Sequence, residues 1–138
     1  MVIINYNLKE NAKEIDDLLI KELKIKTGKK SRGEKVISLA SFIDSEYVGG
    51  IIGKITFETC YIDLLAIKHE RRGGGIGTEL IKTLECEVLK LGIKKIHLST
   101  QDYQAKEFYL KMNYEIAATI KDIPFVGTTR YIFIKDLN

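Results

Sequence analysis

The sequence predicts an α/β (α+β) fold: a central mixed, mostly antiparallel sheet of about six to seven strands with one parallel pair, flanked by about four helices. Three consecutive β-type runs occupy residues 36–68, and a glycine loop and an amphipathic helix connect the third run to a fourth. Two more β-type runs follow. Strand, helix and strand in this order form a right-handed crossover, which makes the two strands parallel. We expect residues 1–138 to form a single domain, because this length is near the usual domain size.

The composition is that of a small globular protein, with 45% hydrophobic and 30% charged residues. A net charge of +3 is too small to indicate nucleic-acid binding by itself. No apolar run approaches membrane-spanning length, and the sequence does not begin with the pattern of a secretion signal. We therefore expect a cytoplasmic protein that binds neither nucleic acid nor membrane.

The first 35 residues contain one expected helix. Val2–Tyr6 is a short β-rich run, and Asn11 and Glu14 have the spacing of a capping box. Apolar residues then recur at helical spacing over Ile15–Leu23, which indicates an amphipathic helix. The stretch Lys24–Arg32 has five cations and no acid. It is either a loop over an acidic substrate or phosphate or a solvated loop, and it lacks the interleaved aromatic residues of a nucleic-acid surface.

The later elements follow from period and turn residues. The expected strands are Val36–Asp44, Tyr47–Thr59, Cys60–Lys68, Lys94–Thr100, Glu115–Ile120 and Arg130–Leu137. The first two form a hairpin with polar turn residues, and the near-continuous apolar character of the third predicts burial on both faces. Apolar residues at helical spacing predict a helix from Ile76 to Leu91, which Gly92 ends. A short helix is expected from about Gln104 to Met112.

The loop before the longer helix is rich in glycine. Its glycines are Gly73, Gly74, Gly75 and Gly77. A helix start has unpaired N–H groups and partial positive charge, and a phosphate placed there satisfies both. Glycines allow close approach of the backbone and positive φ. With Arg72 at its mouth, the loop is typical of a diphosphate site; the alternative is a glycine-rich turn without a ligand.

Spacing separates the families that use such a loop. A P-loop needs G-x-x-x-x-G-K-[ST], and no Gly-Lys-Ser or Gly-Lys-Thr occurs here. The dinucleotide motif G-x-G-x-x-G would need a third glycine at Thr78 or Leu80. The pattern that matches is R-x-x-G-x-G, formed by Arg72, Gly75 and Gly77. It resembles the acyl-CoA-binding motif of the GNAT superfamily of N-acetyltransferases, whose loop amides hold the coenzyme A pyrophosphate.

A second stretch, Gln101–Tyr114, resembles another motif of that superfamily, A-x-x-x-Y-x-K-x-G-[FY]. Its matching residues are Ala105, Tyr109, Lys111 and Tyr114. Asn113 replaces the usual glycine, which is acceptable because asparagine is the next-best residue at a left-handed helix end. Asp102 stands where the family often has an asparagine that contacts the pantetheine arm. The resemblance covers roughly residues 36–137.

The resemblance implies a GNAT-like fold and a ternary-complex transfer of acetyl from acetyl-CoA to a primary amine, with a small-molecule acceptor favoured by analogy. The pantetheine arm would lie along the strand Leu64–Ile67, which would splay from the strand Lys94–Thr100 to make room for it. The amide of Leu65 or Ala66 could then polarise the thioester carbonyl. The implied coenzyme A contacts are Leu65, Ala66, Ile67, Arg72, Gly73, Gly74, Gly75, Ile76, Gly77, Thr78, Asp102, Ala105 and Tyr109. Because members of this family often form dimers, a homodimer stays open.

The resemblance also implies catalytic roles. Tyr109 is the family's usual general acid for the leaving thiolate, and otherwise a buried packing residue. Asp63 is the candidate base for the amine, with Glu58 in reserve, although either carboxylate can instead attract a cationic substrate or be a surface charge. The alternative function is an acyl-CoA-binding or sensing module of the same fold without turnover.

Metal binding is not expected. His69 and His97 have no histidine or cysteine partner at metal-ligand spacing. Cys60 and Cys86 are isolated thiols, which we expect to be reduced and buried.

Overall fold

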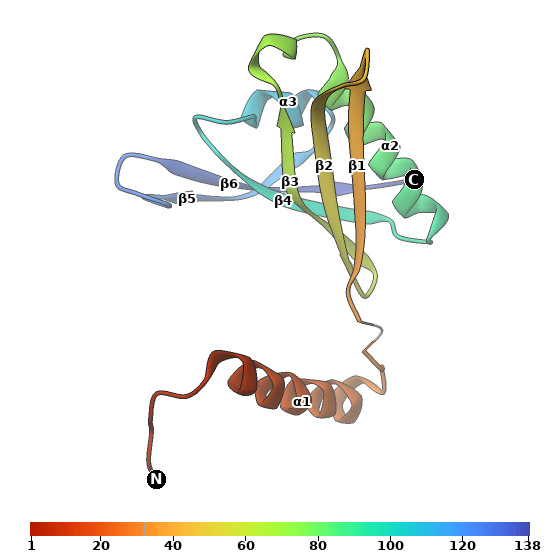
Figure 1. The fold of residues 1–138 in the computed structure, drawn as a ribbon. Coiled ribbons are helices and arrows are strands. Elements are labelled where there is room, and N and C mark those ends of the chain that lie inside the picture. Colours follow the sequence, from red (N-terminus) through yellow and green to blue (C-terminus); the bar gives the residue numbers. More distant parts are fainter. Residues whose placement is uncertain (32) are drawn as a thin grey trace. The chain divides into compact units, whose positions relative to one another are not determined.

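The computed structural model describes residues 1–31 and 33–138, and the chain divides into two compact units, Met1–Gly33 and Glu34–Asn138 (Figure 1). The last residue of the cationic stretch, Arg32, lies outside the described residues. The prediction of one acyltransferase domain over the whole chain stays a prediction. No helix in the described ranges is long and apolar enough to cross a membrane.

The first unit contains helix α1 (Leu8–Thr27). Asn7 caps it, because the Asn7 side chain accepts a hydrogen bond from the Glu10 amide at 3.0 Å. The capping pair is therefore Asn7 and Glu10, whereas the predicted pair, Asn11 and Glu14, lies one turn inside the helix. The run before the cap, residues 2–6, is not a strand, since no neighbouring strand pairs with its backbone.

The second unit contains the sheet. Its elements are β1 (Lys35–Ile43), β2 (Glu46–Thr56), β3 (Thr59–Ile67), the 3-10 turn η1 (His69–Arg71), α2 (Ile76–Lys90), β4 (Lys95–Gln101), α3 (Lys106–Lys111), β5 (Glu115–Lys121) and β6 (Thr129–Asp136). The six strands have the order β1-β2-β3-β4-β6-β5. Only β3 and β4 are parallel, which confirms the predicted mixed sheet with one parallel pair.

A two-residue turn joins β1 and β2. Its central residues, Asp44 and Ser45, both have positive φ, 50° and 65°. Two residues of positive φ form the mirror-image turn whose twist matches that of antiparallel strands. The short polar connection therefore fixes the register of the hairpin, in which Ile43 pairs with Glu46.

One face of the sheet carries the hydrophobic core. The buried residues of α2 are Leu80, Ile81, Leu84 and Val88, and they pack in one cluster with Tyr109 of α3 and alternate residues of β2, β3, β4 and β6. No helix within residues 34–138 covers the other face, where Leu64 of β3 is 61% exposed. Within residues 34–138 the side chains of β3 alternate between a covered and an uncovered face, and the prediction that this strand is buried on both faces stays a prediction.

Candidate active site

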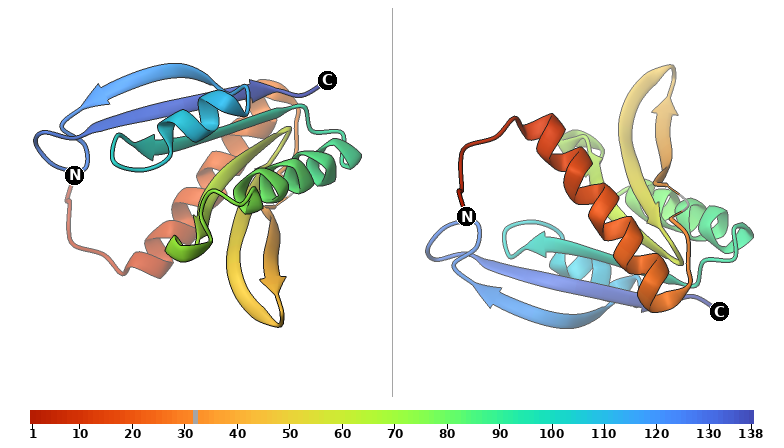
Figure 2. Two further views of the ribbon diagram at one scale, coloured as in Figure 1. Left: turned by 90° about the horizontal axis from the view of Figure 1, so that it is seen from above. Right: turned by 90° about the horizontal axis from the view of Figure 1, so that it is seen from below.

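The parallel strands β3 and β4 pair only over a short segment and then separate. β3 and β4 pair only at Thr59 with Lys95, Cys60 with Ile96 and Tyr61 with His97. Beyond these residues the strands diverge, while β4 and β6 run side by side (Figures 1 and 2). The segment 62–67 of β3 consequently has no strand partner on its β4 side. Its backbone can accept an extended molecule as an added strand.

A β-bulge lies where the strands part. Ile52 pairs with Leu64 and Gly53 pairs with Ile62, so Asp63 is the extra residue of β3. The bulge shifts the alternation of side chains, and Leu65 therefore faces the core, as Ile62 does. A bulge also increases local twist and bends the strand. We attribute the divergence of β3 from β4 partly to this bend.

The glycine loop follows η1 and starts α2 with N–H groups that have no intrahelical acceptor. Glu79 N donates the first helical bond to Gly75 O at 3.0 Å, and no side chain caps the helix. The amides of Ile76, Gly77 and Thr78 therefore have no intrahelical acceptor. Gly75 has φ +85°, and a Cβ placed there would meet no atom within 4 Å. The loop thus presents three N–H groups and open space to an anion.

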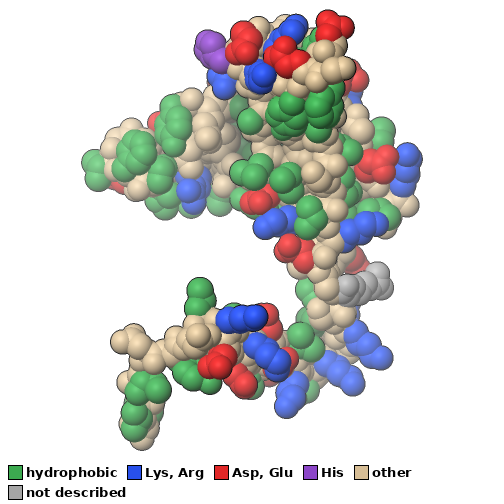
Figure 3. Space-filling model, viewed as in Figure 1, with side chains coloured by type: hydrophobic (Ala, Val, Ile, Leu, Met, Phe, Trp, Pro, Cys, Tyr) green, Lys and Arg blue, Asp and Glu red, His purple; other side chains and the backbone are tan. Residues whose placement is uncertain are grey.

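Charged side chains gather at this end of the larger unit, around η1 and the β1–β2 hairpin (Figure 3). Glu46 pairs with Lys68 at 2.9 Å and with Arg71 at 3.8 Å, and the Lys68 ammonium holds the pKa of Glu46 below its usual value. Arg72 instead donates from Nε to the Ile67 carbonyl at 3.3 Å, and it has no acidic partner in the part of the chain that the structure describes. Its guanidinium is thus held beside the loop, and no acidic side chain of the described residues neutralises its charge.

Gly77 brings α2 into contact with α3. A Cβ at Gly77 would lie 3.2 Å from Cζ of Phe108, closer than side chains normally pack. The first turn of α2 can approach this ring only because residue 77 has no side chain. The glycine therefore has a packing role besides its place in the loop, and it connects the glycine loop to the helix that carries Tyr109.

Tyr109 of α3 lies in the core with 5% of its surface exposed. Its ring contacts Phe108, Tyr114 and Phe133 at centroid distances of 5.3, 5.7 and 5.6 Å. Burial raises the pKa of Tyr109 to about 12, so the phenol is neutral at physiological pH. Its hydroxyl has no hydrogen-bond partner among the described residues and is free to donate to an incoming group.

The two candidate bases occupy different places on β3. Asp63 is half-buried in the bulge and pairs with Lys54 Nζ at 3.4 Å. Glu58 lies in the turn before β3. Leu65 lies seven positions further along the extended strand, which corresponds to roughly 23 Å. The structure therefore places Asp63, but not Glu58, beside the open edge.

Asp102 and Ala105 lie between β4 and α3. Asp102 exchanges two hydrogen bonds with Thr129: its amide donates to Thr129 O at 2.9 Å, and its Oδ2 accepts from Thr129 N at 3.0 Å. The carboxylate thus already ties the end of β4 to the start of β6. Ala105 is the N-cap residue of α3 and packs against the core, so it positions the helix of Tyr109.

The histidines and cysteines do not form a cluster. His97 packs its ring beside Tyr61 at 5.0 Å, and Cys60 and Cys86 are both free thiols. Cys60 is buried as predicted, but the predicted burial of Cys86 is wrong, because Cys86 lies on the side of α2 that faces away from the core. Within residues 1–31 and 33–138, no group of three or more histidine, cysteine or acidic side chains could hold a metal ion.

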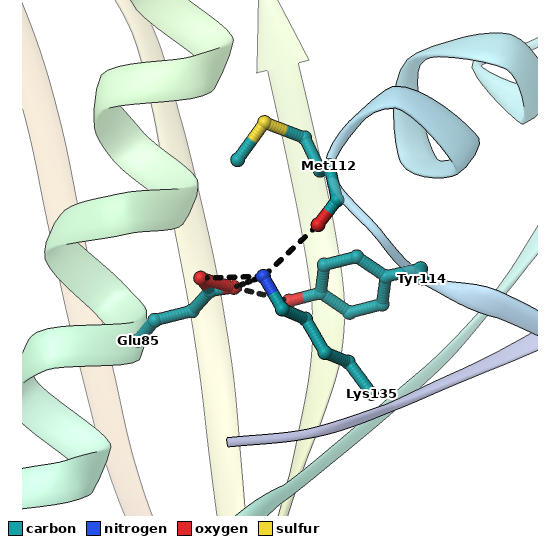
Figure 4. Close-up of polar contacts among 4 residues, drawn as sticks. All are labelled: Glu85, Met112, Tyr114 and Lys135. Atoms are coloured by element: carbon teal, nitrogen blue, oxygen red, sulfur yellow. Dashed lines mark hydrogen bonds and ion pairs between the residues drawn. The ribbon is translucent and has the colours of Figure 1, made fainter. Parts of the chain in front are cut away.

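A polar cluster under α2 was missed at the sequence level. It joins Glu85 of α2, Lys135 of β6, Tyr114 and the Met112 carbonyl at the end of α3 (Figure 4). Two patterns could have indicated it: Glu85 adjoins the apolar stripe of α2, and Lys135 alternates with Tyr131 and Phe133 on the core face of β6. An acid and a base at core positions of two elements suggest a partnership.

Comparison with known proteins adds to this geometry. The model of the acetyltransferase (GNAT) family matches residues 8–114. Blasticidin-S acetyltransferase of Streptomyces morookaense is 33% identical over 93 residues, which are 67% of this chain and 68% of that protein. An acetyltransferase of Bacillus cereus has a crystal structure that superposes with a TM-score of 0.89 at 25% identity, over 99% of this chain and 98% of the other. An aminoglycoside 6'-N-acetyltransferase complexed with coenzyme A superposes at 0.67 with 20% identity, over 99% and 97%.

Proposed function

The chain belongs to the GNAT family of acetyltransferases and is an acyltransferase, and we propose that it moves the acetyl group of acetyl-CoA to a primary amine of a small molecule. The observation that carries the proposal is the open edge of β3, which continues through the turn η1 into the glycine loop. The edge offers backbone groups to the amide-rich pantetheine arm, and the loop offers three amides to the pyrophosphate. A glycine-rich turn without a ligand would need neither the open strand edge nor the free amides.

Three groups of residues would hold the coenzyme. The amides of Ile76, Gly77 and Thr78 bind the pyrophosphate, with the Arg72 guanidinium beside them. The backbone from Leu65 to Ile67 pairs with the pantetheine arm, which leaves the thioester near the bulge. An amide of Leu65 or Ala66 then stabilises the oxyanion that forms on the carbonyl.

Proton transfers complete the reaction. The neutral amine attacks the thioester carbonyl carbon, the C–S bond breaks, and the departing sulfur takes a proton from the Tyr109 hydroxyl. Tyr109 faces the core side of the sheet, whereas Asp63 pairs with Lys54 from the bulge. Asp63 is the residue we assign to accept the proton that the amine loses. At pH 7 an alkylamine of pKa about 10.4 is almost entirely protonated, so a base assists attack.

The acceptor is proposed to be a small molecule. The names of two similar proteins give blasticidin-S and an aminoglycoside as their acceptors, and both are small molecules.

The test is a calorimetric titration with acetyl-CoA followed by an assay of free thiol with a panel of amines. The panel includes polyamines, aminoglycosides and aminonucleosides. We expect micromolar binding and thiol release that depends on the amine. Absence of acetyl-CoA binding would overturn the proposal. Tight binding without thiol release for any amine would favour an acyl-CoA-binding or sensing module of the same fold.

A further inference from the structure

The polar cluster of Glu85, Lys135 and Tyr114 connects three elements beneath the site. Lys135 Nζ donates to both carboxylate oxygens of Glu85 at 3.0 Å and to the Met112 carbonyl at 2.9 Å. The Tyr114 hydroxyl donates to Glu85 Oε2 at 3.1 Å. The side chains of Lys135 and Glu85 are only 18% and 12% exposed. The cluster is thus a largely buried and fully bonded joint between α2, β6 and the end of α3 (Figure 4).

Tyr114 extends this joint to Tyr109. The Tyr114 amide donates to the Tyr109 carbonyl at 3.0 Å, and the two rings meet edge to face at 5.7 Å and 71°. Asn113, with φ 66°, makes the left-handed turn that folds Tyr114 back under α3. Movement of the Tyr114 ring therefore displaces the Tyr109 ring directly.

Glu85 extends the joint in the other direction. It lies nine residues after Ile76 on α2, which is roughly 13 Å along a rigid helix from the glycine loop. The contact of Phe108 with Gly77 joins the same two helices a second time, at the loop itself. The anion site and Tyr109 are thus connected by two fixed contacts.

We propose that Glu85, Lys135 and Tyr114 are positioning residues for acetyl transfer, because they hold the Tyr109 hydroxyl at a constant distance from the coenzyme anchored at the start of α2. The inference rests on the proposed function. A buried ion pair contributes little net stability compared with apolar residues of the same size, so core stability alone gives little reason for the cluster. It does give one defined arrangement of α3 on α2, which a reaction that needs placement of its acid within a fraction of an ångström requires.

The decisive experiment is a double-mutant cycle on kcat between Tyr114→Phe and Tyr109→Phe. Tyr114→Phe removes one hydroxyl and leaves Glu85 bonded to Lys135, so the buried charges stay paired. In the wild-type background we expect kcat to fall about tenfold while KM for acetyl-CoA changes less than about twofold. In the Tyr109→Phe background the same substitution should change kcat less than about twofold, because the group that it positions is already absent.

A second variant tests the ion pair without leaving a lone buried charge. Glu85→Gln combined with Lys135→Met should show the same dependence on Tyr109. The matched control is Glu87→Gln with Lys90→Met, an exposed ion pair on the same helix, which should leave kcat unchanged. Circular dichroism and thermal unfolding of all variants verify that each is folded at the assay temperature.

The outcomes separate failure of the positioning role from failure of the proposed function. Equal losses of kcat with and without Tyr109 would show that the cluster supports only the fold, and would overturn the inference while the proposed function stands. Loss of acetyl-CoA affinity with unchanged kcat would also overturn it. A wild-type protein without amine-dependent thiol release would instead remove the proposed function itself, and the inference with it.

Discussion

The two edges of β4 differ in the length of their strand pairing, and this difference explains the open edge of β3. On one edge β4 pairs with β6 over its whole length, from Lys95 with Asp136 to Gln101 with Arg130. On the other edge it pairs with β3 over three residues only. The strand is the same, so its own β-propensity cannot account for the difference.

The difference lies in the neighbours. The β6 edge is closed by the continuous pairing of β4 with β6 and by the Asp102–Thr129 bonds, while the β3 edge is interrupted by the Asp63 bulge. Complete pairing on one side stabilises β4 enough to leave the other side open. An open edge inside a sheet, rather than at its margin, is protected from association with other chains and remains available to a ligand.

The largest expected effect comes from blocking the anion end of the open edge. Gly75→Glu places a carboxylate beside the free amides of α2, and we expect acetyl-CoA affinity to fall at least about a hundredfold by calorimetry. Gly92→Glu is the matched control, since Gly92 has φ +79° and equally open surroundings at the other end of α2. If both variants lose affinity equally, backbone strain and not the anion site is responsible.

A somewhat smaller effect is expected at Tyr109. Tyr109→Phe should lower kcat about a hundredfold, as for loss of a general acid, with little change in KM. Because burial raises the pKa of Tyr109 to about 12, the acid stays protonated through the neutral range and kcat should not decline until well above pH 10. An alkaline decline that persists unchanged in the phenylalanine variant would assign it to another group.

The same pKa affects stability. The folded-state pKa lies above the value of about 10 in the unfolded chain, so the contribution of Tyr109 to the unfolding free energy is constant below pH 10 and decreases as pH rises from 10 through 12. The pKa of Tyr114 and of Cys60 is also raised by burial, and both contribute to this decrease in either protein. The shallower slope expected in Tyr109→Phe, measured by denaturant unfolding, isolates the contribution of Tyr109.

A more modest effect is expected in the bulge. Asp63→Asn should lower kcat/KM about tenfold near pH 7, and the loss should shrink as pH approaches about 10 because more of the amine is already neutral. Lys54→Met is the control, since it removes the ion pair but keeps the carboxylate. Similar losses in both variants would indicate that the pair supports the bulge and that Asp63 accepts no proton.

The smallest effect concerns the thiol reactivity of Cys60, which lies in the segment of β3 that pairs with β4. Cys60 has no exposed surface, and burial raises its thiol pKa to about 11, so only about one molecule in a thousand is a thiolate at pH 8. Cys86 is exposed. A thiol reagent at pH 8 should therefore label one cysteine rapidly. Labelling of both at similar rates would mean that the three paired residues open readily.

The outline of the second unit was readable from the sequence because its signals are local. The predicted strand Val36–Asp44 differs from β1 by one residue at each end, and the predicted helix Ile76–Leu91 differs from α2 by one. Alternation, a helical period and glycine stops are each set by neighbouring residues. The glycine loop was found in the same way, since its spacing is contiguous.

The details of the site were not readable because they depend on partners far apart in the chain. The bulge adds Asp63 within an apolar run without any turn residue to mark it. The length of the β3–β4 pairing depends on packing against α2 and β6. The bond of Lys135 with Glu85 joins residues 50 apart, and no local period connects them.

The short parallel ladder also has a consequence for the order of folding. β1, β2 and β3 are joined by tight turns, so their pairing closes only small loops. The β3–β4 pairing instead closes a loop that contains the whole of α2, and three residue pairs offset little of that entropy. We expect this ladder to form after the transition state, with φ-values near zero at Tyr61 and His97. The open edge of β3 would then lie in the last part of the sheet to assemble.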